Sequence, residues 1–136
     1  AKAAAASHDY AAARAKVESL QASGRLAESD VEAFAHAGKF EETAVALAML
    51  CALPIDVIER AMVQDREETI LIVAKASGLS WPTVKAVLLL CADKGGMSAH
   101  ALEQCRTVFN KLKRETAQQV IAFQRKRQAS QPLPGA

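Results

Sequence analysis

Two pairs of adjacent glutamates raise the question of carboxylate chemistry in this chain of 136 residues. Glu41–Glu42 and Glu67–Glu68 each precede a threonine and an apolar run, so the motif Glu-Glu-Thr occurs twice, twenty-six positions apart. General acid–base catalysis needs two carboxyl groups that converge in one pocket and differ in pKa. Adjacent helical residues point in different directions, whereas the first turn of a helix favours negative charge. The pairs therefore predict helix starts, and we expect them to form an acidic edge that a partner could contact.

The cysteines and histidines give no recognised catalytic or metal-binding motif. Cys51, Cys91 and Cys105 include no CxxC pair, and we expect them to be buried thiols. Cys91, His100 and Cys105 come nearest to a zinc site, but they lack a fourth ligand and a recognised spacing. The sequence also lacks a nucleophile elbow, a phosphate-binding loop and a dinucleotide fingerprint. We expect a protein that is not an enzyme and that uses no cofactor or metal.

Positive charge is concentrated toward the C-terminal end of the sequence. Residues 1–98 contain ten basic and thirteen acidic side chains, whereas residues 99–136 contain seven basic and two acidic ones. A basic helix can bind phosphates, but no aromatic residues alternate with these charges as they do in proteins that stack bases. Nucleic-acid binding is therefore less favoured than protein binding. The basic candidate partner contacts are Lys113, Arg114, Arg125, Lys126 and Arg127.

The composition of the chain predicts an all-α protein. Apolar residues make up 51% of it and aromatic residues only 4%, and alanine and leucine are abundant. Small apolar residues with high helix propensity favour closely packed helices over sheets. The longest apolar run, residues 44–54, is shorter than the roughly 18–20 residues that cross a bilayer. We expect no membrane span and a cytoplasmic protein or fragment.

The length of the chain allows one core but hardly two, so we expect a single domain over residues 15–128. Residues 1–14 are Ala-rich and are either an N-terminal extension or the start of the first helix. Residues 129–136 contain two prolines and a glycine, and we expect them to be a disordered tail.

Cap residues and glycines divide the domain into helices. Ser29–Glu32 and Asp65–Glu68 fit capping boxes, and Ser80 precedes a Trp-Pro pair typical of a helix start. Glycines are expected at helix ends, because glycine adopts the left-handed conformation without strain. The expected helices cover residues 8–23, 29–37, 40–51, 54–63, 66–77, 81–93 and 98–128.

The two Glu-Glu-Thr motifs belong to a longer internal match. At the offset of twenty-six residues, Ala48 aligns with Ala74, and Leu53 aligns with Leu79. A helix, a tight turn and a second helix would then occur twice, which favours short helical hairpins stacked as a small HEAT-like solenoid. The alternative is a compact orthogonal bundle in which two hairpins merely look alike.

The last expected helix carries an apolar stripe along its whole length. It is either one long helix or two helices with a break near residues 110–113. We expect it to lie across the other helices, and the alternative is a homodimer formed through this C-terminal helix. The stripe consists of Leu102, Cys105, Phe109, Leu112, Thr116, Gln119 and Phe123, with Val120 beside it.

Trp81 is the only tryptophan in the sequence. A tryptophan at a helix start either packs half-buried between neighbouring helices or anchors a partner at the surface. We expect the half-buried position, and we keep Trp81, Glu41 and Glu67 among the candidate partner contacts.

Three segments resemble a known family. They are LPIDVIE at residues 53–59, ASGLSW at 76–81 and RETAQ at 114–118. Over residues 15–128 the chain resembles an alphaproteobacterial family catalogued as domain of unknown function 2336, whose members look like short HEAT-type repeats. The family pattern has a tryptophan where this chain has Gln124. The resemblance implies a helical fold and a non-enzymatic bacterial module, and it supplies no catalytic residues.

We therefore expect an interaction module that binds another protein, with a role in bacterial regulation or signalling. Helical repeats usually present extended surfaces to their partners. The alternative is nucleic-acid binding through the basic C-terminal helix. A third hypothesis is a small-molecule sensor with a cavity between the Ala-rich helices.

Overall fold

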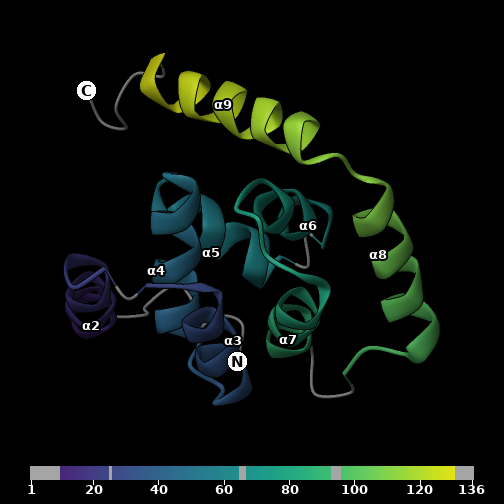
Figure 1. Cartoon of the computed structure of the whole chain (residues 1–136), viewed down its shortest axis with the longest axis horizontal. Coiled ribbons are helices and arrows are strands. Elements are labelled where there is room, and N and C mark those ends of the chain that lie inside the picture. Colours follow the sequence, from purple (N-terminus) through teal and green to yellow (C-terminus); the bar gives the residue numbers. More distant parts are fainter. Residues whose placement is uncertain (1–9, 25, 65–66, 93–95, 131–136) are drawn as a thin grey trace.

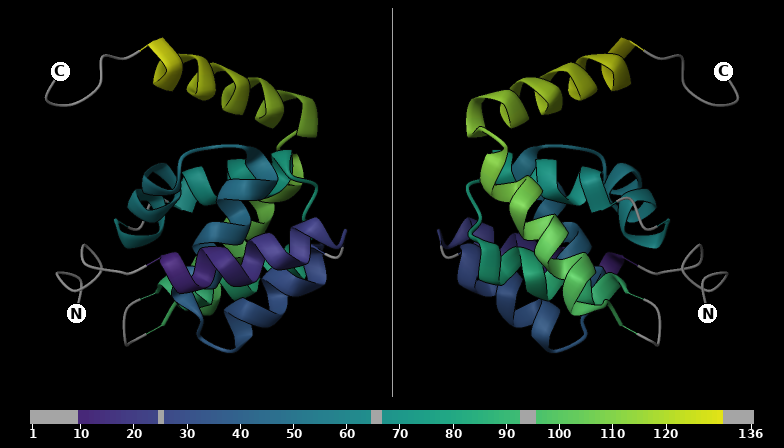
Figure 2. Two further views of the ribbon diagram at one scale, coloured as in Figure 1. Left: turned by 90° about the vertical axis from the view of Figure 1, so that its left-hand side faces the viewer. Right: turned by 90° about the vertical axis from the view of Figure 1, so that its right-hand side faces the viewer.

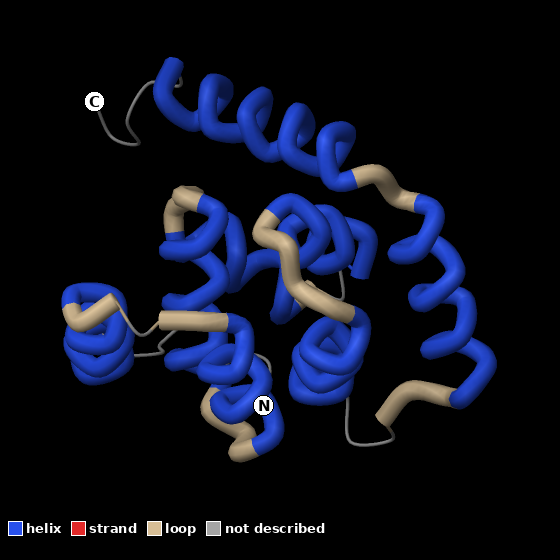
Figure 3. The backbone as a smooth tube through the Cα atoms, in the orientation of Figure 1, coloured by secondary structure: helices blue, strands red, loops and turns tan. Residues whose placement is uncertain are grey.

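The computed structural model describes residues 10–24, 26–64, 67–92 and 96–130. Within these ranges the chain forms eight α-helices and no strand, which confirms the all-α prediction (Figures 1 and 3). None of the helices in these ranges combines the length and the hydropathy that a bilayer crossing requires. Residues 131–136 of the expected tail lie outside the described ranges. The helices are α2 (Ala11–Ala22), α3 (Glu28–His36), α4 (Phe40–Cys51), α5 (Ile55–Val63), α6 (Glu67–Ala76), α7 (Trp81–Cys91), α8 (Ala99–Lys111) and α9 (Arg114–Ser130).

The C-terminal part of the chain is two helices instead of one long helix. Leu112 leaves the helical conformation, with φ −73° and ψ 128°, and α9 starts two residues later at Arg114. This confirms a break near residues 110–113. The break lets α9 change direction and lie across the other helices, while α8 covers one side of the molecule (Figures 1 and 2).

Helices α4 and α6 form the centre of the molecule. Residues 43–48 of α4 are all buried, and so are Ile70, Leu71, Val73 and Ala74 of α6. A helix that is buried at consecutive positions must be covered on several sides. In agreement with this, α4 packs against α2, α3, α5, α6 and α7.

Long-range helix pairs close the fold into a bundle. Helix α3 packs along α7, and α6 packs along α9, although both pairs are far apart in the sequence (Figure 1). In an open stack, each hairpin would contact only its neighbours along the chain. The bundle alternative therefore describes the architecture, and the HEAT-like repeat character stays a prediction.

Helices α4 and α6 end with the same backbone geometry. The N–H of Leu53 donates to the carbonyl oxygen of Ala48 at 3.1 Å, and the equivalent bond closes α6 at 2.9 Å. The residue before the donor is left-handed in both cases, with φ 56° at Ala52 and φ 79° at Gly78. These two residues occupy matched positions of the internal match. Glycine adopts this conformation without strain, whereas alanine does not.

Replacing Ala52 with glycine is therefore expected to stabilise the protein by about 1 kcal/mol. Urea denaturation measures the change in the free energy of unfolding. Ala37→Gly is the matched control, because Ala37 follows α3 with φ −81°, where alanine is unstrained. The control should lose stability, since glycine costs folding entropy there. A loss of unfolding free energy in both variants would contradict backbone strain at Ala52.

The start of α3 differs from the predicted capping box. The helix begins at Glu28, so Ser29 lies inside the first turn and the box of Ser29 with Glu32 is wrong. Asp30 occupies the third helical position instead, and its Oδ2 accepts a hydrogen bond from the N–H of Ala27 at 2.8 Å. A second predicted box begins at Asp65, which lies outside the described residues.

The start of α7 is capped by a carboxylate from α3. Ser80 is the N-cap as expected, but both its N–H, at 2.6 Å, and its hydroxyl donate to Oε2 of Glu28. The buried hydroxyl of Thr83 donates to the same oxygen at 2.6 Å. Burial raises the pKa of Glu28, but the hydrogen bonds from Ser80 and Thr83 outweigh burial and lower the pKa overall. Glu28 therefore fixes α3 to α7 as an anion.

The predicted apolar stripe does not continue past the break. Cys105 and Phe109 of α8 are buried, which agrees with the prediction. On α9, however, Val120 is 42% exposed and Phe123 is 63% exposed. The buried residues of α9 are Ala117 and Ile121. The prediction is wrong for α9, because the break at Leu112 rotates the second helix so that another face meets α6. Thr116 and Gln119 are exposed as well.

Candidate functional site

The predicted partner contacts do not lie on a single surface. Trp81 is half-buried, and its ring centroid lies 6.1 Å from that of Phe109, with the ring planes tilted by 47°. Trp81, the first residue of α7, therefore packs against Phe109 of α8. This confirms the half-buried position, and Trp81 is better explained by packing than as an exposed anchor.

The two Glu-Glu-Thr motifs begin α4 and α6, as predicted. The carboxylates do not form one acidic edge, because they face different helices. Burial raises the pKa of Tyr10 at the start of α2, the nearby Glu59 carboxylate adds to this, and the charge of Glu41 contributes last. Glu67 Oε2 instead accepts a hydrogen bond from the Cys105 thiol of α8 at 3.2 Å. Helices α2 and α8 lie on opposite sides of the molecule (Figure 1).

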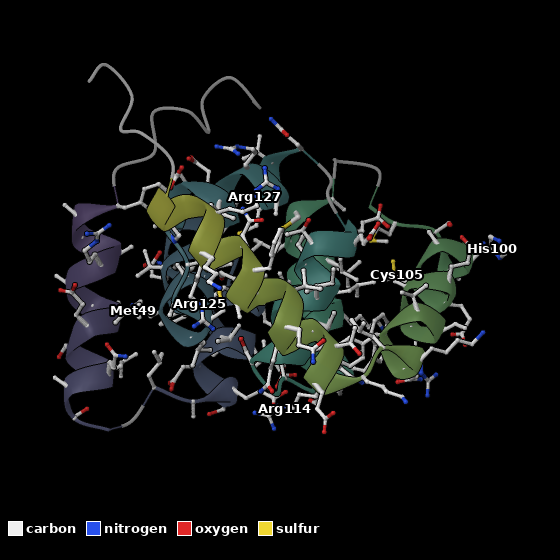
Figure 4. The ribbon with its side chains drawn as sticks, turned by 90° about the horizontal axis from the view of Figure 1, so that it is seen from above. Met49, His100, Cys105, Arg114, Arg125 and Arg127 are labelled. Carbon is white, nitrogen blue, oxygen red and sulfur yellow. The ribbon has the colours of Figure 1, made fainter. Side chains whose placement is uncertain are left out.

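The predicted basic residues are divided between two sides of α9. Arg114 and Arg125 lie along one edge of the helix, and Arg127 lies on the opposite edge (Figure 4). Residues that are eleven positions apart return to the same side of a helix after three turns. Lys113 is exposed in the turn before α9. The structure therefore brings together Arg114 and Arg125, and it separates them from Arg127.

Arg114 and Arg125 line one hollow of about 340 Å³, which we call the basic pocket. It lies where the C-terminal ends of α4 and α6 meet the underside of α9. Gln118 lies between the two arginines, and its Nε2 donates to the carbonyl oxygen of Ala76 at 3.4 Å. The basic pocket is lined by Leu50, Cys51, Ala76, Ser77, Arg114, Gln118, Ile121 and Arg125.

The charge of the basic pocket is uncompensated within the described part of the chain. Neither Arg114 nor Arg125 donates a hydrogen bond or forms an ion pair with a described residue, and no carboxylate lines the pocket. The Ser77 hydroxyl is shielded from solvent and has no hydrogen-bond partner among those residues. Burial raises the pKa of Cys51 to about 11, against backbone hydrogen bonds and the charge of Arg125. The thiol is therefore neutral at pH 7, and the pocket is cationic.

This arrangement can bind an anion. Guanidinium groups donate paired hydrogen bonds that match the oxygens of carboxylates and phosphates. The lining residues include no carboxylate or histidine that could act as a general base. The described ranges also contain no group of three histidine, cysteine or acidic residues placed to hold a metal ion. The pocket is therefore a candidate binding site for an acidic group.

A purely structural role for the two arginines is the simpler alternative. The ends of α4 and α6 carry partial negative charge, which a nearby cation stabilises by about 0.3–1 kcal/mol. However, the carbonyl oxygens of Ala48 and Ala74 already accept backbone hydrogen bonds from the turns that follow. Arg114 and Arg125 donate to neither of them. Their donors therefore remain available to a partner.

The sequence alone did not identify Ser77 and Gln118 as members of this site. Gln118 could have been found, because it lies four residues after Arg114 and seven before Arg125, on the same side of a helix. Ser77 gave no such signal, since it reaches the pocket from the end of α6. Its position depends on how α6 packs against α9.

Gly78 positions Arg114, and this gives a testable prediction. A Cβ atom on Gly78 would lie 3.1 Å from Nη2 of Arg114, so Gly78→Ala should displace the guanidinium as well as strain the left-handed backbone. Gly38 has a similar φ of +73° and no neighbour within 4 Å, so Gly38→Ala introduces the strain alone. Both variants should lose about 1–2 kcal/mol of unfolding free energy.

Only Gly78→Ala should shift the Arg114 side-chain signals in NMR spectra. Equal shifts in both variants would show that Arg114 does not rest on Gly78.

One comparison with known proteins gives a match. Residues 1–122 match the model of a family described as "Uncharacterised protein conserved in bacteria (DUF2336)". Comparisons with curated proteins and with solved structures give no match. The match covers most of the chain and agrees with the resemblance of its three diagnostic segments, while the narrower alphaproteobacterial origin stays a prediction. The chain therefore belongs to this bacterial family, DUF2336.

Proposed function

We propose that this chain is a non-enzymatic module that binds an acidic segment of another protein along the basic pocket of α9. The observation that carries the proposal is the pair Arg114 and Arg125, two guanidinium groups without ionic partners in the described chain that share one hollow. Arg114 and Arg125 are both exposed, so their guanidinium groups are accessible to a partner. A partner carboxylate would supply the missing charge.

The spacing of the two arginines favours a segment over a single small ion. Their Cα atoms are eleven residues apart on one helix, which corresponds to about 16 Å. Arg114 rests against Gly78 near the start of α9, and Arg125 lies near Cys51 toward the other end. An extended segment spans about 16 Å in five residues. Two acidic residues about five positions apart in a partner would therefore reach both guanidinium groups.

The basic pocket also explains how the segment would be held. The Gln118 amide and the Ser77 hydroxyl lie between the charged ends, where they can bind the backbone of an extended segment. Leu50, Ala76 and Ile121 contribute the smaller, apolar part of a lining that is mostly polar.

The setting proposed for this binding is bacterial regulation or signalling in the cytoplasm. The three free cysteines support a reducing compartment, since paired cysteines are usual in oxidising ones. A HEAT-like use of the helical hairpins as a binding platform would be compatible with the proposal.

An NMR titration with an acidic probe tests the proposal. The probe is an oligoglutamate peptide, and a single-stranded DNA oligonucleotide of equal charge serves as the competing class. Oligoglutamate should shift the backbone amides of Ser77 and Gln118 and the side chain of Arg125. The Lys126→Gln/Arg127→Gln variant should keep these shifts, and the Arg114→Gln/Arg125→Gln variant should lose them.

The two double variants carry the same loss of charge, so nonspecific attraction would affect both equally. Equal losses, or tighter binding of the oligonucleotide than of the peptide, would contradict the proposal.

A further inference from the structure

A second hollow, the α6–α8 groove, lies away from the basic pocket. It has a volume of about 370 Å³ and an apolar floor formed by Leu71 and Ile72 of α6, by Val108 of α8 and by Leu112, which follows α8. Val108, which is part of this apolar floor, is 50% exposed to solvent. A groove of this size between two helices is suited to large apolar side chains of a third helix.

One end of the α6–α8 groove is acidic. Glu67 and Glu68 line it, and neither has a cation within ion-pair distance in the described part of the chain. The Cys105 thiol, which points from α8 toward the rest of the molecule, donates to Glu67 (Figure 4). Burial raises the pKa of Cys105 to about 11, and the hydrogen bond to Glu67 contributes to this. The thiol stays protonated at neutral pH and holds Glu67 at the groove, which therefore favours a ligand with apolar groups next to a cation.

The outer face of α9, formed by Val120 and Phe123, has that chemistry. Phe123 is 63% exposed and Val120 is 42% exposed, and the two residues are three positions apart on one side of the helix. Arg127 lies one turn further along the same side. An apolar pair followed by a cation matches the apolar floor and the acidic end of the α6–α8 groove.

The outer face of α9 cannot reach the groove of its own chain. Ala117 and Ile121 are buried where α9 packs against α6, whereas Val120 and Phe123 remain exposed. We infer that α9 of one copy of this chain inserts Val120 and Phe123 into the α6–α8 groove of a second copy. Arg127 then lies near Glu67 and Glu68 of that copy.

The distribution of exposed apolar side chains supports this pairing. Within the described ranges, four large apolar residues remain strongly exposed: Leu89, Val108, Val120 and Phe123. Three of them belong to the two surfaces that the inference brings together. Contiguous exposed apolar groups of complementary shape and charge are typical of interaction sites. Leu89 on α7 lies outside both surfaces and provides a matched control.

Analytical ultracentrifugation of the full chain measures the association. The wild-type protein should self-associate in a concentration-dependent way below about 1 mM. Phe123→Gln removes the apolar anchor, and Val108→Lys places a cation in the groove. Each should weaken self-association by about 10- to 100-fold. Leu89→Gln should leave it unchanged. All three positions are exposed, so thermal unfolding should show that every variant folds.

A mixing experiment distinguishes this pairing from other dimers. Phe123→Gln retains an intact groove, and Val108→Lys retains an intact outer face on α9. An equimolar mixture should therefore associate through the one intact contact, more tightly than either variant alone. Contact between two α9 helices would not be restored in this way, because one of the two outer faces would still lack Phe123.

Three results would overturn the inference. The wild-type chain could remain a monomer up to about 1 mM. Val108→Lys could associate like the wild type, which would assign the contact to α9 alone. The mixture could remain monomeric, which would separate the two surfaces.

Discussion

Replacing Glu28 with glutamine is expected to lower the free energy of unfolding by about 2 kcal/mol at pH 7. The carboxylate accepts three hydrogen bonds, from the N–H and hydroxyl of Ser80 and from the hydroxyl of Thr83. Thr83 is fully buried, so its hydroxyl cannot turn to water when the anion is lost. Hydrogen bonds to a charged acceptor are stronger than those to a neutral amide. Urea denaturation followed by circular dichroism measures the change.

The effect of Glu28→Gln should depend on pH. Hydrogen bonds hold the pKa of Glu28 below its ordinary value in the folded state, in spite of burial. The group therefore contributes its full stability above the pKa of an unfolded glutamate, and this contribution is lost as the pH falls through the folded pKa. The stability difference between wild type and variant should shrink on acidification below the ordinary carboxyl pKa.

Glu32→Gln is the matched control on the same helix. Glu32 lies 3.5 Å from His36 in an exposed i,i+4 pair, which contributes less than about 0.5 kcal/mol. A large loss in the control, or a stability difference for Glu28→Gln that does not change with pH, would contradict the capping role of Glu28.

The second large effect concerns binding. The Arg114→Gln/Arg125→Gln variant is expected to bind an acidic protein partner up to about 30-fold more weakly, because two exposed ion pairs contribute up to about 1 kcal/mol each. Glutamine keeps hydrogen-bonding capacity and helix propensity, so the change is chiefly one of charge. Isothermal titration calorimetry at two salt concentrations measures the affinity, and higher salt should weaken wild-type binding more than variant binding.

The control for this prediction is Lys126→Gln/Arg127→Gln. It removes the same formal charge from the same helix but leaves the basic pocket intact. We expect a change below about 3-fold, caused only by the weaker long-range field. Equal losses in the two double variants would show that net charge, and not the pocket, governs binding.

The two predictions rest on features that differ in how well a sequence reveals them. Helix starts and ends follow from local chemistry, such as Ser80 before a Trp-Pro pair and a glycine at position 78, and these predictions agree with the structure. The break near Leu112 is one of two alternatives that the sequence leaves open. Cap residues and helix-ending glycines affect only one or two helical turns, so each can be recognised in a short stretch of sequence.

Contacts between distant helices are not visible in the same way. Glu28 looks like an ordinary first-turn glutamate, and its partners Ser80 and Thr83 lie 52 and 55 residues away. The prediction of an apolar stripe along α9 is wrong for the same reason, because the buried face of α9 depends on how this helix packs against α6. The basic pocket combines both cases: Arg114 and Arg125 share a side of one helix, but Ser77 joins them only through packing.

The faces of α9 can be assigned separate roles on this basis. Ala117 and Ile121 attach the helix to α6, and the arginine edge forms the basic pocket. The outer face carries Val120 and Phe123. A partner bound at the edge and a second copy bound at the outer face would not compete for the same side chains, so variants can separate the two interactions.

Affinity capture from a bacterial lysate treated with nuclease tests the central proposal most directly. Wild type, Arg114→Gln/Arg125→Gln and Lys126→Gln/Arg127→Gln serve as parallel baits, and bound proteins are identified by mass spectrometry. The proposal predicts that wild type and the Lys126/Arg127 variant retain the same protein, that this protein contains an acidic segment, and that the Arg114/Arg125 variant loses it. Retention of that protein by all three baits would contradict binding of an acidic protein at the basic pocket. Capture of the protein by wild type from an untreated lysate, but not from the nuclease-treated one, would contradict it as well.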